Sequence, residues 1–455
     1  MPPKIIPRPE HTVSRKDIDP DALKVLYRLK NRGFIAYLVG GGVRDLLLGR
    51  KPKDFDIGTS AHPQQVKKLF GNCFVVGRRF RLCHVRFGSK VVEVSTFRRL
   101  APPEEGDTLI RRDNTFGSPE EDAFRRDFTV NALFYDIATF SVIDYVDGLE
   151  DLARRTIRTI GDPVVRFRED PVRMLRAVAL AARLGFKIDT LSLEAIRFLR
   201  GEIVRSSPAR LLDEFYKILR QGASRRTFEM LHEVGLLAYL LPEADRAIGE
   251  QGERLLGSLS RLDDYRNSGF AAPADLTNSL VMGTLIVPLG IPLRRAIHTP
   301  RRSAVAEEQK PSPLDVRAEM AVLGDPEMEA DDEAGPSGPP SPVTLPFARR
   351  DADRLRLVLA AQSRLREVHN TPRVRHLLLG RGYFEEALRW MEIHGGVSGR
   401  ELAAHWRTLG ADEAAVAGSE AGELGAAPEV PAPRRRRRRR RRRPGAGPPS
   451  APIAS

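Results

Sequence analysis

Two aspartates with one residue between them are the first feature of this sequence that points to chemistry. Asp54 and Asp56 flank Phe55 in the segment Lys53-Asp-Phe-Asp-Ile57. On an extended strand both carboxylates would share one face, while Phe55 points into the core. Two carboxylates this close repel each other unless a cation lies between them, and Mg²⁺ prefers carboxylate and phosphate oxygens. The pattern predicts a two-metal site, and a solvated Asp-x-Asp at a loop edge is the other interpretation.

Three consecutive glycines, Gly40, Gly41 and Gly42, precede this aspartate pair by about one short helix. Glycines ahead of a helix let backbone N–H groups point together at an anion, and the helix dipole favours negative charge there. Arg44, on the first turn of that helix, would reach a triphosphate. The segment lacks the Gly-Lys-Ser/Thr ending of a Walker A loop. A tight turn needed for packing is the alternative interpretation.

A third carboxylate is available in the segment Arg125-Arg126-Asp127-Phe-Thr-Val-Asn131. Asp127 would join the catalytic carboxylates, and Arg126 would hold phosphate oxygens. Glu93 competes with Asp127 for the role of third carboxylate, and Asp127 is preferred. By charge alone, Arg125 to Asp127 is equally well a surface ion-pair cluster.

A charged helix start follows in the segment Arg168-Glu169-Asp170-Pro171-Val-Arg173-Met-Leu-Arg176. Asp170 is placed to cap a helix with Pro171 in its first turn. Arg173 and Arg176 then lie three residues apart on one helical face. Such a rigid polar face would hydrogen-bond the edge of a base and select a nucleotide without a template. A structural ladder of salt bridges is the alternative.

The elements that must position these residues are of two kinds. Up to about residue 155 the pattern alternates between short apolar strands and helices, which predicts a mixed sheet flanked by helices. The strands are expected at residues 34–39, around 55–57, and at 73–76, 83–87, 91–96, 134–137 and 142–145, with helices at 21–32 and 43–48. After Arg155 the apolar spacing becomes helical, first at residues 170–184, 191–199 and 209–219.

Composition and charge limit the class of protein. The chain has 455 residues and a net charge of +14, of which ten positive charges form the run Arg434 to Arg443. Such a run attracts polyanions, with nucleic acid the natural partner and an anionic membrane surface second, although a solvated tail without a role is also compatible. With Cys73 and Cys83 alone, reduced thiols are expected. The sequence shows no apolar leader and no membrane span, so we expect a cytoplasmic location.

The same patterns predict a division of the chain into regions. They are a flexible N-terminus (1–20), a mixed-sheet region (21–155), two consecutive helical regions (156–225 and 226–293), a disordered insert (294–345), a further helical region (346–396) and a mostly disordered tail (397–455) that carries the arginine run (434–443). The expected fold class is α+β, with a mixed sheet followed by all-helical regions.

Taken together, the three charged blocks resemble the class II tRNA nucleotidyltransferase and bacterial poly(A) polymerase family, within the DNA polymerase beta-like nucleotidyltransferase superfamily. The resemblance implies that Asp54 and Asp56 bind two Mg²⁺ ions and that Asp127 is the third catalytic carboxylate. It implies nucleotide-phosphate contacts for Gly41, Arg44 and Arg126, with Gly42 in the same turn, and a base-reading role for the helix face that carries Asp170, Arg173 and Arg176. The resemblance also implies that residues 21–155 form a nucleotidyltransferase catalytic head and residues 156–225 a nucleotide-selecting and RNA-binding neck. Residues 226–293 would then be the helical body and residues 346–396 a helical C-terminal RNA-binding region. One departure is Ala179, where many relatives carry a further arginine.

Within this family, the segment Val75-Val-Gly-Arg-Arg-Phe-Arg-Leu-Cys-His-Val85 is similar to a signature of the poly(A) polymerases. The resemblance implies transfer of AMP from ATP to RNA 3′ hydroxyl ends with release of pyrophosphate, in mRNA polyadenylation and RNA turnover. Arg78, Arg79 and Arg81 would guide single-stranded RNA with broad specificity, mainly by its phosphates. The alternatives are a CCA-adding tRNA nucleotidyltransferase and a non-catalytic RNA-binding protein.

Overall fold

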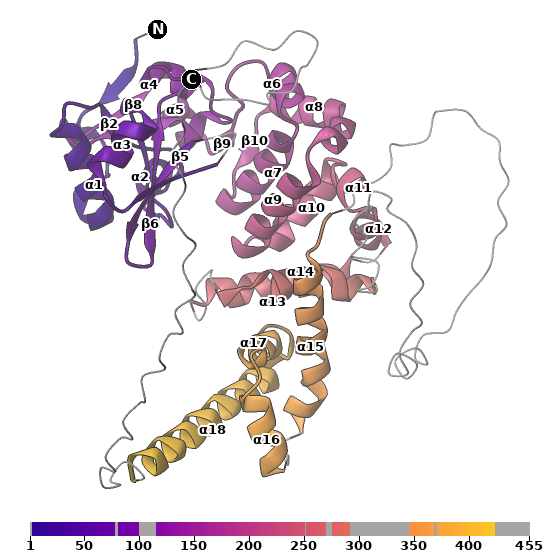
Figure 1. Cartoon of the computed structure of the whole chain (residues 1–455). Coiled ribbons are helices and arrows are strands. Elements are labelled where there is room, and N and C mark those ends of the chain that lie inside the picture. Colours follow the sequence, from indigo (N-terminus) through magenta and orange to yellow (C-terminus); the bar gives the residue numbers. More distant parts are fainter. Residues whose placement is uncertain are drawn as a thin grey trace, which may run out of the picture. The chain divides into compact units, whose positions relative to one another are not determined.

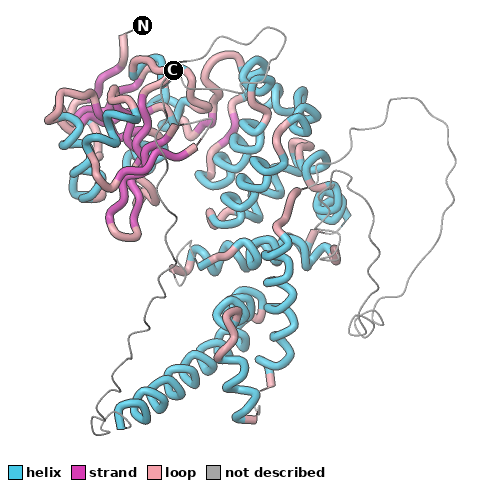
Figure 2. Tube along the Cα trace, in the orientation of Figure 1, coloured by secondary structure: helices cyan, strands magenta, loops and turns pink. Residues whose placement is uncertain are grey.

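The fold is described from a computed structural model. The described residues are 2–77, 81–99, 115–250, 252–269, 275–291, 345–367 and 371–423, with the backbone alone for residues 413–423. The chain forms two compact units, one up to Ala403 and a second from Ala404. Figures 1 and 2 show strands gathered in the N-terminal part and helices in the parts that follow.

The head is built on an eight-stranded mixed sheet with the order β1-β8-β7-β2-β3-β6-β5-β4. All neighbouring strands are antiparallel except β3 and β6, which are parallel. The strands are β1 (Lys4–Ile6), β2 (Ala36–Val39), β3 (Asp56–Thr59), β4 (Cys73–Val76), β5 (Leu82–Phe87), β6 (Lys90–Thr96), β7 (Leu133–Asp136) and β8 (Ser141–Asp144). The central position of β2 and β3 places the glycine turn and the aspartate pair in the middle of the sheet.

The head helices are α1 (Pro20–Lys30), α2 (Gly41–Leu47), α3 (Pro63–Leu69), α4 (Pro119–Phe124) and α5 (Gly148–Ala153). Helix α1 begins where the Asp19 side chain accepts hydrogen bonds from the N–H groups of Asp21 and Ala22. Its apolar stripe, with Leu26 and Leu29 fully buried, packs into the same core as Leu38 of β2 and Ile57 of β3. One sheet face is therefore closed by helix and core.

The first twenty residues are a correction to the sequence analysis, which expected a flexible N-terminus. Residues 4–6 form the edge strand β1, in antiparallel register with β8. Val13 and Ile18 are buried, and the His11 ring bonds the carbonyl of Phe140 at 2.9 Å. The strand has only three residues between two prolines, which is too short to show the alternating pattern by which a strand is predicted from sequence. Pairing with β8 therefore determines the conformation of these residues.

The second part of the fold is almost entirely helical, as expected. A short parallel pair, β9 (Thr156–Ile157) and β10 (Lys187–Ile188), accompanies its first helices. The helices are α6 (Pro163–Glu169), α7 (Val172–Leu184), α8 (Thr190–Leu199), α9 (Pro208–Arg220), α10 (Ser224–Glu233), α11 (Leu237–Leu240), α12 (Pro242–Glu250), α13 (Glu253–Asn267), α14 (Asn278–Ile286), α15 (Arg349–Arg366), α16 (Pro372–Leu379), α17 (Phe384–His394) and α18 (Gly396–Glu423). The predicted fold class is confirmed.

Amphipathic helices hold this part together. Helix α9 buries Leu211, Phe215 and Leu219 at helical spacing, and α10 adds Phe228, whose ring centroid lies 6.0 Å from that of Phe215. Burial of each such side chain stabilises the fold by about 1.5–3 kcal/mol. In the described part of the chain, every helix is too short or too polar to span a lipid bilayer.

The first part of the C-terminal tail is helical. Residues 397–455 were expected to be mostly disordered; α18 continues to Glu423, and the rest of the tail lies outside the described residues. Alanine, glutamate and leucine supply helix propensity through this stretch, and the helix continues through its glycines. The expected insert up to residue 344 and the arginine run at 434–443 lie outside the described residues.

Candidate active site

The aspartate pair lies where the loop after α2 enters β3. Asp56 is the first residue of β3, whereas Asp54 stands in the loop just before it, so the expectation that one strand carries both residues is wrong in detail. The Asp54 side chain is 72% exposed, with Lys53 Nζ 3.8 Å from its Oδ2. Phe55 between them packs against the core, as expected.

A third carboxylate lies beside this pair on the neighbouring strand. Ile57 of β3 is in register with Val94 of β6, so Asp56 and Glu93, each one residue earlier, are neighbours on parallel strands. Burial and the charges of Glu93 and Asp54 raise the pKa of Asp56 to about 6, against the opposing effect of Arg126. Like charges held together in this way favour the binding of a cation.

This donor set fits hard divalent ions because carboxylate oxygens, with substrate phosphates, are the ligands that Mg²⁺ prefers. Among the described residues, no group of three or more His, Cys, Asp or Glu side chains is close enough to form a complete metal site by itself.

The glycine turn between β2 and α2 brings three parts of the site close together. Gly40 has φ of +75°, and a Cβ atom there would lie 3.1 Å from Arg126 Nη1. A Cβ atom on Gly42 would lie 3.3 Å from the carbonyl oxygen of Asp54, and one on Gly41 would lie 3.3 Å from Arg44 Nη2. The close contacts show that packing requires small residues in this turn, which was the alternative interpretation. Contact of Gly41 and Gly42 with phosphate stays a prediction.

The two arginines expected to contact phosphates are both held at Asn131. Arg44 is buried, donates from Nε and Nη2 to Asp45 Oδ1 at 2.8 and 2.7 Å, and donates from Nη1 to Asn131 Oδ1. Arg126 donates from Nε and Nη2 to Asp122 Oδ2 at 3.1 and 3.0 Å and from Nη1 to the Asn131 carbonyl at 3.1 Å. Both guanidinium groups therefore have fixed positions close to the aspartate pair.

Asp127 lies in a different environment from the aspartate pair. Its Oδ1 accepts a hydrogen bond from Phe128 N at 2.9 Å, and Arg176 Nη2 of α7 is 2.7 Å from its Oδ2. Burial opposes ionisation, but the charges of Arg176 and Arg173 lower the pKa of Asp127 below its usual value. Of the two candidates for the third carboxylate, Glu93 lies next to Asp56 on the neighbouring strand, whereas Asp127 forms an ion pair with Arg176.

Helix α7 carries the residues expected to read the base. Asp170 does not cap this helix, because the N-cap residue is Pro171 and the Asp170 carboxylate pairs with Arg210 of α9 at 2.8 and 3.0 Å. Two hydrogen bonds to a guanidinium hold that carboxylate better than a cap would. Arg173 is buried and donates from Nη1 to the carbonyl of Arg166 at 2.9 Å.

Glu169 and Arg166 tie this helix to the head. Glu169 Oε2 lies 2.7 Å from Arg166 Nη1 and 3.2 Å from Arg173 Nη1. Arg166 Nη2 donates to the carbonyl oxygens of Arg125 and Arg126 at 2.7 and 3.0 Å. These contacts join the end of α6 and the start of α7 to the backbone just before Asp127.

Several members of the site were not chosen from the sequence. Glu169 and Asn131 stand inside the quoted motifs, so their position was a usable signal. Asp122 stands three and four residues before its partners Arg125 and Arg126, so its helical spacing was also a usable signal. Arg210 gave no local signal, because its partner Asp170 is forty residues away in the sequence. Among the expected RNA contacts, Arg81 is exposed in the turn before β5, while Arg78 and Arg79 lie outside the described residues.

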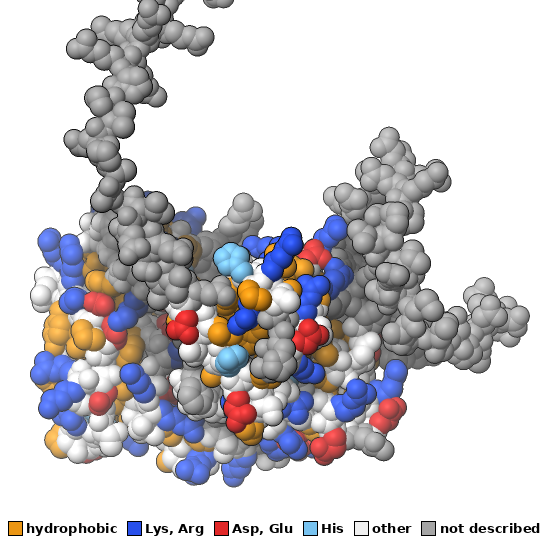
Figure 3. Space-filling model, turned by 90° about the horizontal axis from the view of Figure 1, so that it is seen from below, with side chains coloured by type: hydrophobic (Ala, Val, Ile, Leu, Met, Phe, Trp, Pro, Cys, Tyr) orange, Lys and Arg blue, Asp and Glu red, His pale blue; other side chains and the backbone are white. Residues whose placement is uncertain are grey.

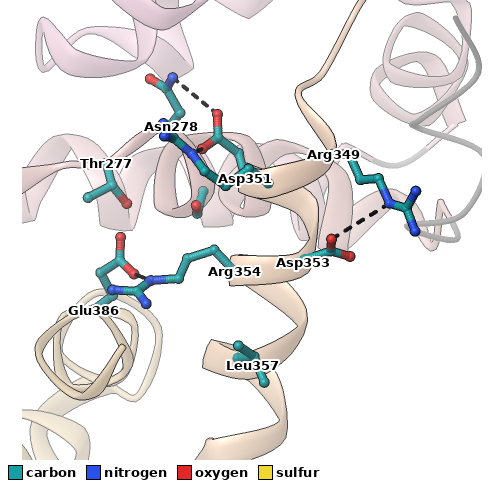
Figure 4. Close-up of a pocket in the computed structure, with 10 residues that line it drawn as sticks. Thr277, Asn278, Arg349, Asp351, Asp353, Arg354, Leu357 and Glu386 are labelled. Carbon is teal, nitrogen blue, oxygen red and sulfur yellow. Dashed lines mark hydrogen bonds and ion pairs between the residues drawn. The ribbon is translucent and has the colours of Figure 1, made fainter. Parts of the chain in front are cut away.

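A polar pocket lies elsewhere, between α14, α15 and α17 (Figure 4). Its charged side chains face one another: Asn278 Nδ2 is 3.3 Å from Asp351 Oδ2, and Arg354 pairs with Glu386. These pairs join the three helices, and none of the lining residues belongs to the candidate active site.

The fold and the site define a class. A mixed sheet with an Asp-x-Asp pair at the start of a central strand, a glycine turn beside it and helices behind it is the fold of a nucleotidyltransferase. The solved CCA-adding enzyme of Bacillus stearothermophilus in complex with CTP aligns with a TM-score of 0.56 and 28% identity, over 86% of this chain and 82% of that one.

Comparison of sequences is more specific. Residues 36–158 match the family model "Poly A polymerase head domain", and residues 185–248 match "Probable RNA and SrmB- binding site of polymerase A". Poly(A) polymerase I of Salmonella typhi is 50% identical over 275 residues, which are 58% of this chain and 59% of that protein. The CCA-adding enzyme of Lactobacillus helveticus is 39% identical over 223 residues, 48% of this chain and 55% of that protein.

The resemblance to the poly(A) polymerase and tRNA nucleotidyltransferase family is therefore confirmed over the head and the helices that follow it. The match spans somewhat more than half the length of these curated relatives.

Proposed function

We propose that this chain is a poly(A) polymerase, which transfers AMP from ATP to RNA 3′ hydroxyl ends and releases pyrophosphate. The observation that carries the proposal is the position of Asp54 and Asp56 at the start of β3, with Glu93 beside Asp56 on β6, in a chain that is 50% identical to poly(A) polymerase I over 275 residues. The proposed roles are mRNA polyadenylation and RNA turnover, in the cytoplasm.

Asp54 and Asp56 would hold two Mg²⁺ ions, which in such sites activate the attacking hydroxyl and neutralise the charge on the phosphates. Glu93 is our proposal for the third carboxylate of the reaction centre in place of Asp127, and its position beside Asp56 on the neighbouring strand supports that proposal. Asp127 instead orients Arg176 toward the nucleotide-binding side of α7, which is a positioning role.

Arg44 and Arg126 would stabilise the negative charge of the triphosphate beside the turn of Gly41 and Gly42. Both are fixed by Asn131, so little reorganisation is needed when the substrate binds. Asp170, Arg173 and Arg176 would select adenine, with Asp170 held in place by Arg210. Side chains whose hydrogen bonds fix their geometry discriminate between bases without a template.

RNA would bind through arginines outside this centre, including Arg78, Arg79, Arg81 and the region 346–396. On the face shown in Figure 3, Lys and Arg side chains are spread more widely than Asp and Glu. On α15, Arg349 and Arg350 are 82% and 94% exposed. Backbone contacts of this kind do not read sequence, which agrees with broad RNA specificity.

The second candidate is a CCA-adding enzyme, favoured by the structural match to the Bacillus stearothermophilus enzyme. The test is incorporation of labelled ATP and CTP on an oligo(A) primer and on a tRNA that lacks its CCA end. A poly(A) polymerase extends oligo(A) with many AMP residues and rejects CTP. Addition of CTP to the tRNA followed by a single AMP would overturn the proposal, and no incorporation at all would leave the non-catalytic RNA-binding protein.

A further inference from the structure

A row of side chains crosses the sheet from the reaction centre to its edge. Phe74 of β4 is in register with His84 of β5, and His84 is in register with Glu93 of β6. Glu93 neighbours Asp56 on β3. Residues directly opposite on neighbouring strands point to the same face, so these four side chains share one face of the sheet.

This face is open at β4, β5 and β6, whereas the opposite face is closed. Cys83, Val85 and Val94 point to the opposite face and are buried in the main core. On the open face, Phe74 is 54% exposed and Val91 is 40% exposed. Among the strands that the structure describes, β4 is the last in the sheet order, so the row reaches the edge of the described sheet.

The chemistry of the row suits an unpaired nucleic acid strand. The guanidinium carbon of Arg86 lies 5.1 Å from the centroid of the Phe74 ring, and Arg86 is exposed. His84 is half-buried, with its Nε2 3.5 Å from Glu93 Oε1. An exposed aromatic ring beside an arginine offers a stacking surface for a base and a positive charge for its phosphate.

The position of the row relative to the reaction centre sets what can bind there. Three strand spacings of about 4.8 Å separate Asp56 from Phe74, so the ring lies roughly 14 Å from the carboxylates. An RNA strand whose 3′ hydroxyl lies at Asp56 reaches the Phe74 ring within a few nucleotides. A single nucleotide bound at the reaction centre is too short to reach it.

We propose that Phe74, His84 and Arg86 form a platform on which bases of the RNA primer stack just upstream of its reacting 3′ end. The proposal rests on the proposed function for the identity of the strand. Stacking on Phe74 is tolerant of sequence because every base has an aromatic face, and Arg86 holds a backbone phosphate. The platform gives affinity and register to the primer and takes no part in the choice of the incoming nucleotide.

The test measures the affinity of a labelled oligo(A) for the full-length protein by fluorescence anisotropy. Phe74→Ala should weaken binding roughly tenfold, within the range known for loss of one stacked base, and Phe74→Trp should keep the wild-type affinity. Arg86→Ala should weaken binding less and reduce its salt dependence. The KM for ATP at saturating primer should not change in any of these variants.

Arg28→Ala is the matched control, since Arg28 of α1 also lies 5.1 Å from an aromatic ring, that of Phe70, but on the helix that covers the other sheet face. It should bind oligo(A) like the wild type. Wild-type affinity in Phe74→Ala, or an equal loss in Arg28→Ala, would overturn the platform. If the wild type adds no nucleotides, the proposed function fails, while binding of oligo(A) to the Phe74 variants still tests the platform.

Discussion

At the scale of single residues, the decisive feature is the concentration of negative charge around Asp56. Burial, Glu93 and Asp54 together raise the pKa of Asp56 to about 6, so the centre favours a bound cation. We predict that Asp54→Asn and Asp56→Asn each lower AMP incorporation on the order of a thousandfold or more, because a metal ligand is lost. Single-turnover rates in Mg²⁺ measure this, with circular dichroism to show that the fold is kept.

Asp21→Asn is the control for these variants, because Asp21 pairs with Lys24 and Lys90 at the surface of α1. It should keep the wild-type rate. A tenth of normal turnover in either Asp54→Asn or Asp56→Asn would contradict the assignment of the metal ligands.

A second prediction at this scale concerns Arg210, which no motif indicated. Its two hydrogen bonds fix the Asp170 carboxylate, so Arg210→Gln should relax the preference for ATP over other nucleotides by roughly 1–3 kcal/mol, about tenfold or more. The ratio of kcat/KM for ATP and CTP is the measurement. Arg205→Gln, which breaks a surface pair with Glu202, is the matched control and should leave the ratio unchanged.

Residue types and spacing were enough to find the aspartate pair and the charged start of α7. They were not enough to choose between Asp127 and Glu93, since register between β3 and β6 is a property of the folded sheet. The same holds for Arg210, forty residues from its partner. Local spacing reports which side chains share an element, whereas long-range pairing decides which elements meet.

At the scale of elements, the turn between β2 and α2 holds the centre together. Gly40→Ala would place a side chain at φ of +75° and a methyl group 3.1 Å from Arg126 Nη1. We predict a loss of about 1–3 kcal/mol in unfolding free energy together with a large fall in activity, because Arg126 must move. Gly49→Ala is matched for positive φ but has open space around its Cβ position, so it should lose stability and keep activity.

Chemical denaturation and the incorporation rate test this pair of variants. Equal activity loss in Gly40→Ala and Gly49→Ala would mean that backbone strain alone accounts for the effect and that the contact with Arg126 does not matter.

The helical region has an acid-sensitive contact of its own. His394 of α17 lies 3.2 Å from Thr284 Oγ1 of α14 and stacks on Trp390, and burial with the charge of Arg261 lowers its pKa to about 3. Between about pH 6.5 and pH 3, His394 therefore binds a proton in the unfolded chain but not in the folded chain. The free energy of unfolding is unaffected by this histidine above pH 6.5 and decreases as the pH falls from 6.5 to 3.

We predict that this histidine costs about 2 kcal/mol of unfolding free energy between pH 6.5 and pH 4.5. Urea denaturation at a series of pH values measures the slope, which His394→Gln should reduce. His405→Gln alters an exposed histidine and should leave the slope unchanged. An unchanged slope in His394→Gln would mean that this ring is protonated in the folded state.

Element boundaries followed from the sequence wherever apolar periodicity was strong. Strand β4 lies at the expected residues 73–76, α8 begins one residue earlier than expected, and α9 is longer than expected by one residue at each end. Two of the elements that were not expected have weak periodicity: β1 is three residues long, and α18 lacks an apolar stripe. Such segments take their structure from a partner strand or from propensity alone.

At the scale of the whole molecule, charge is distributed very unevenly along the chain. Ten of the net fourteen positive charges stand in the run Arg434 to Arg443, outside the described residues. We propose that this run, which follows a segment of Ala, Gly, Glu and Pro, raises the local concentration of RNA near the catalytic part. On this proposal the run contributes to RNA affinity and not to the choice of nucleotide.

We predict that truncation after Ala432 weakens oligo(A) binding and flattens its salt dependence, while turnover at saturating primer and the preference for ATP stay the same. Each arginine that neutralises a phosphate of a single strand changes the slope of log affinity against log salt by about 0.7, so five engaged arginines change it by roughly 3.5. A full-length variant with the run replaced by Gly and Ser separates charge from length and should behave like the truncation. Parallel salt plots with equal affinities would show that the run does not contact RNA, and an anionic surface or a partner protein would then be its ligand.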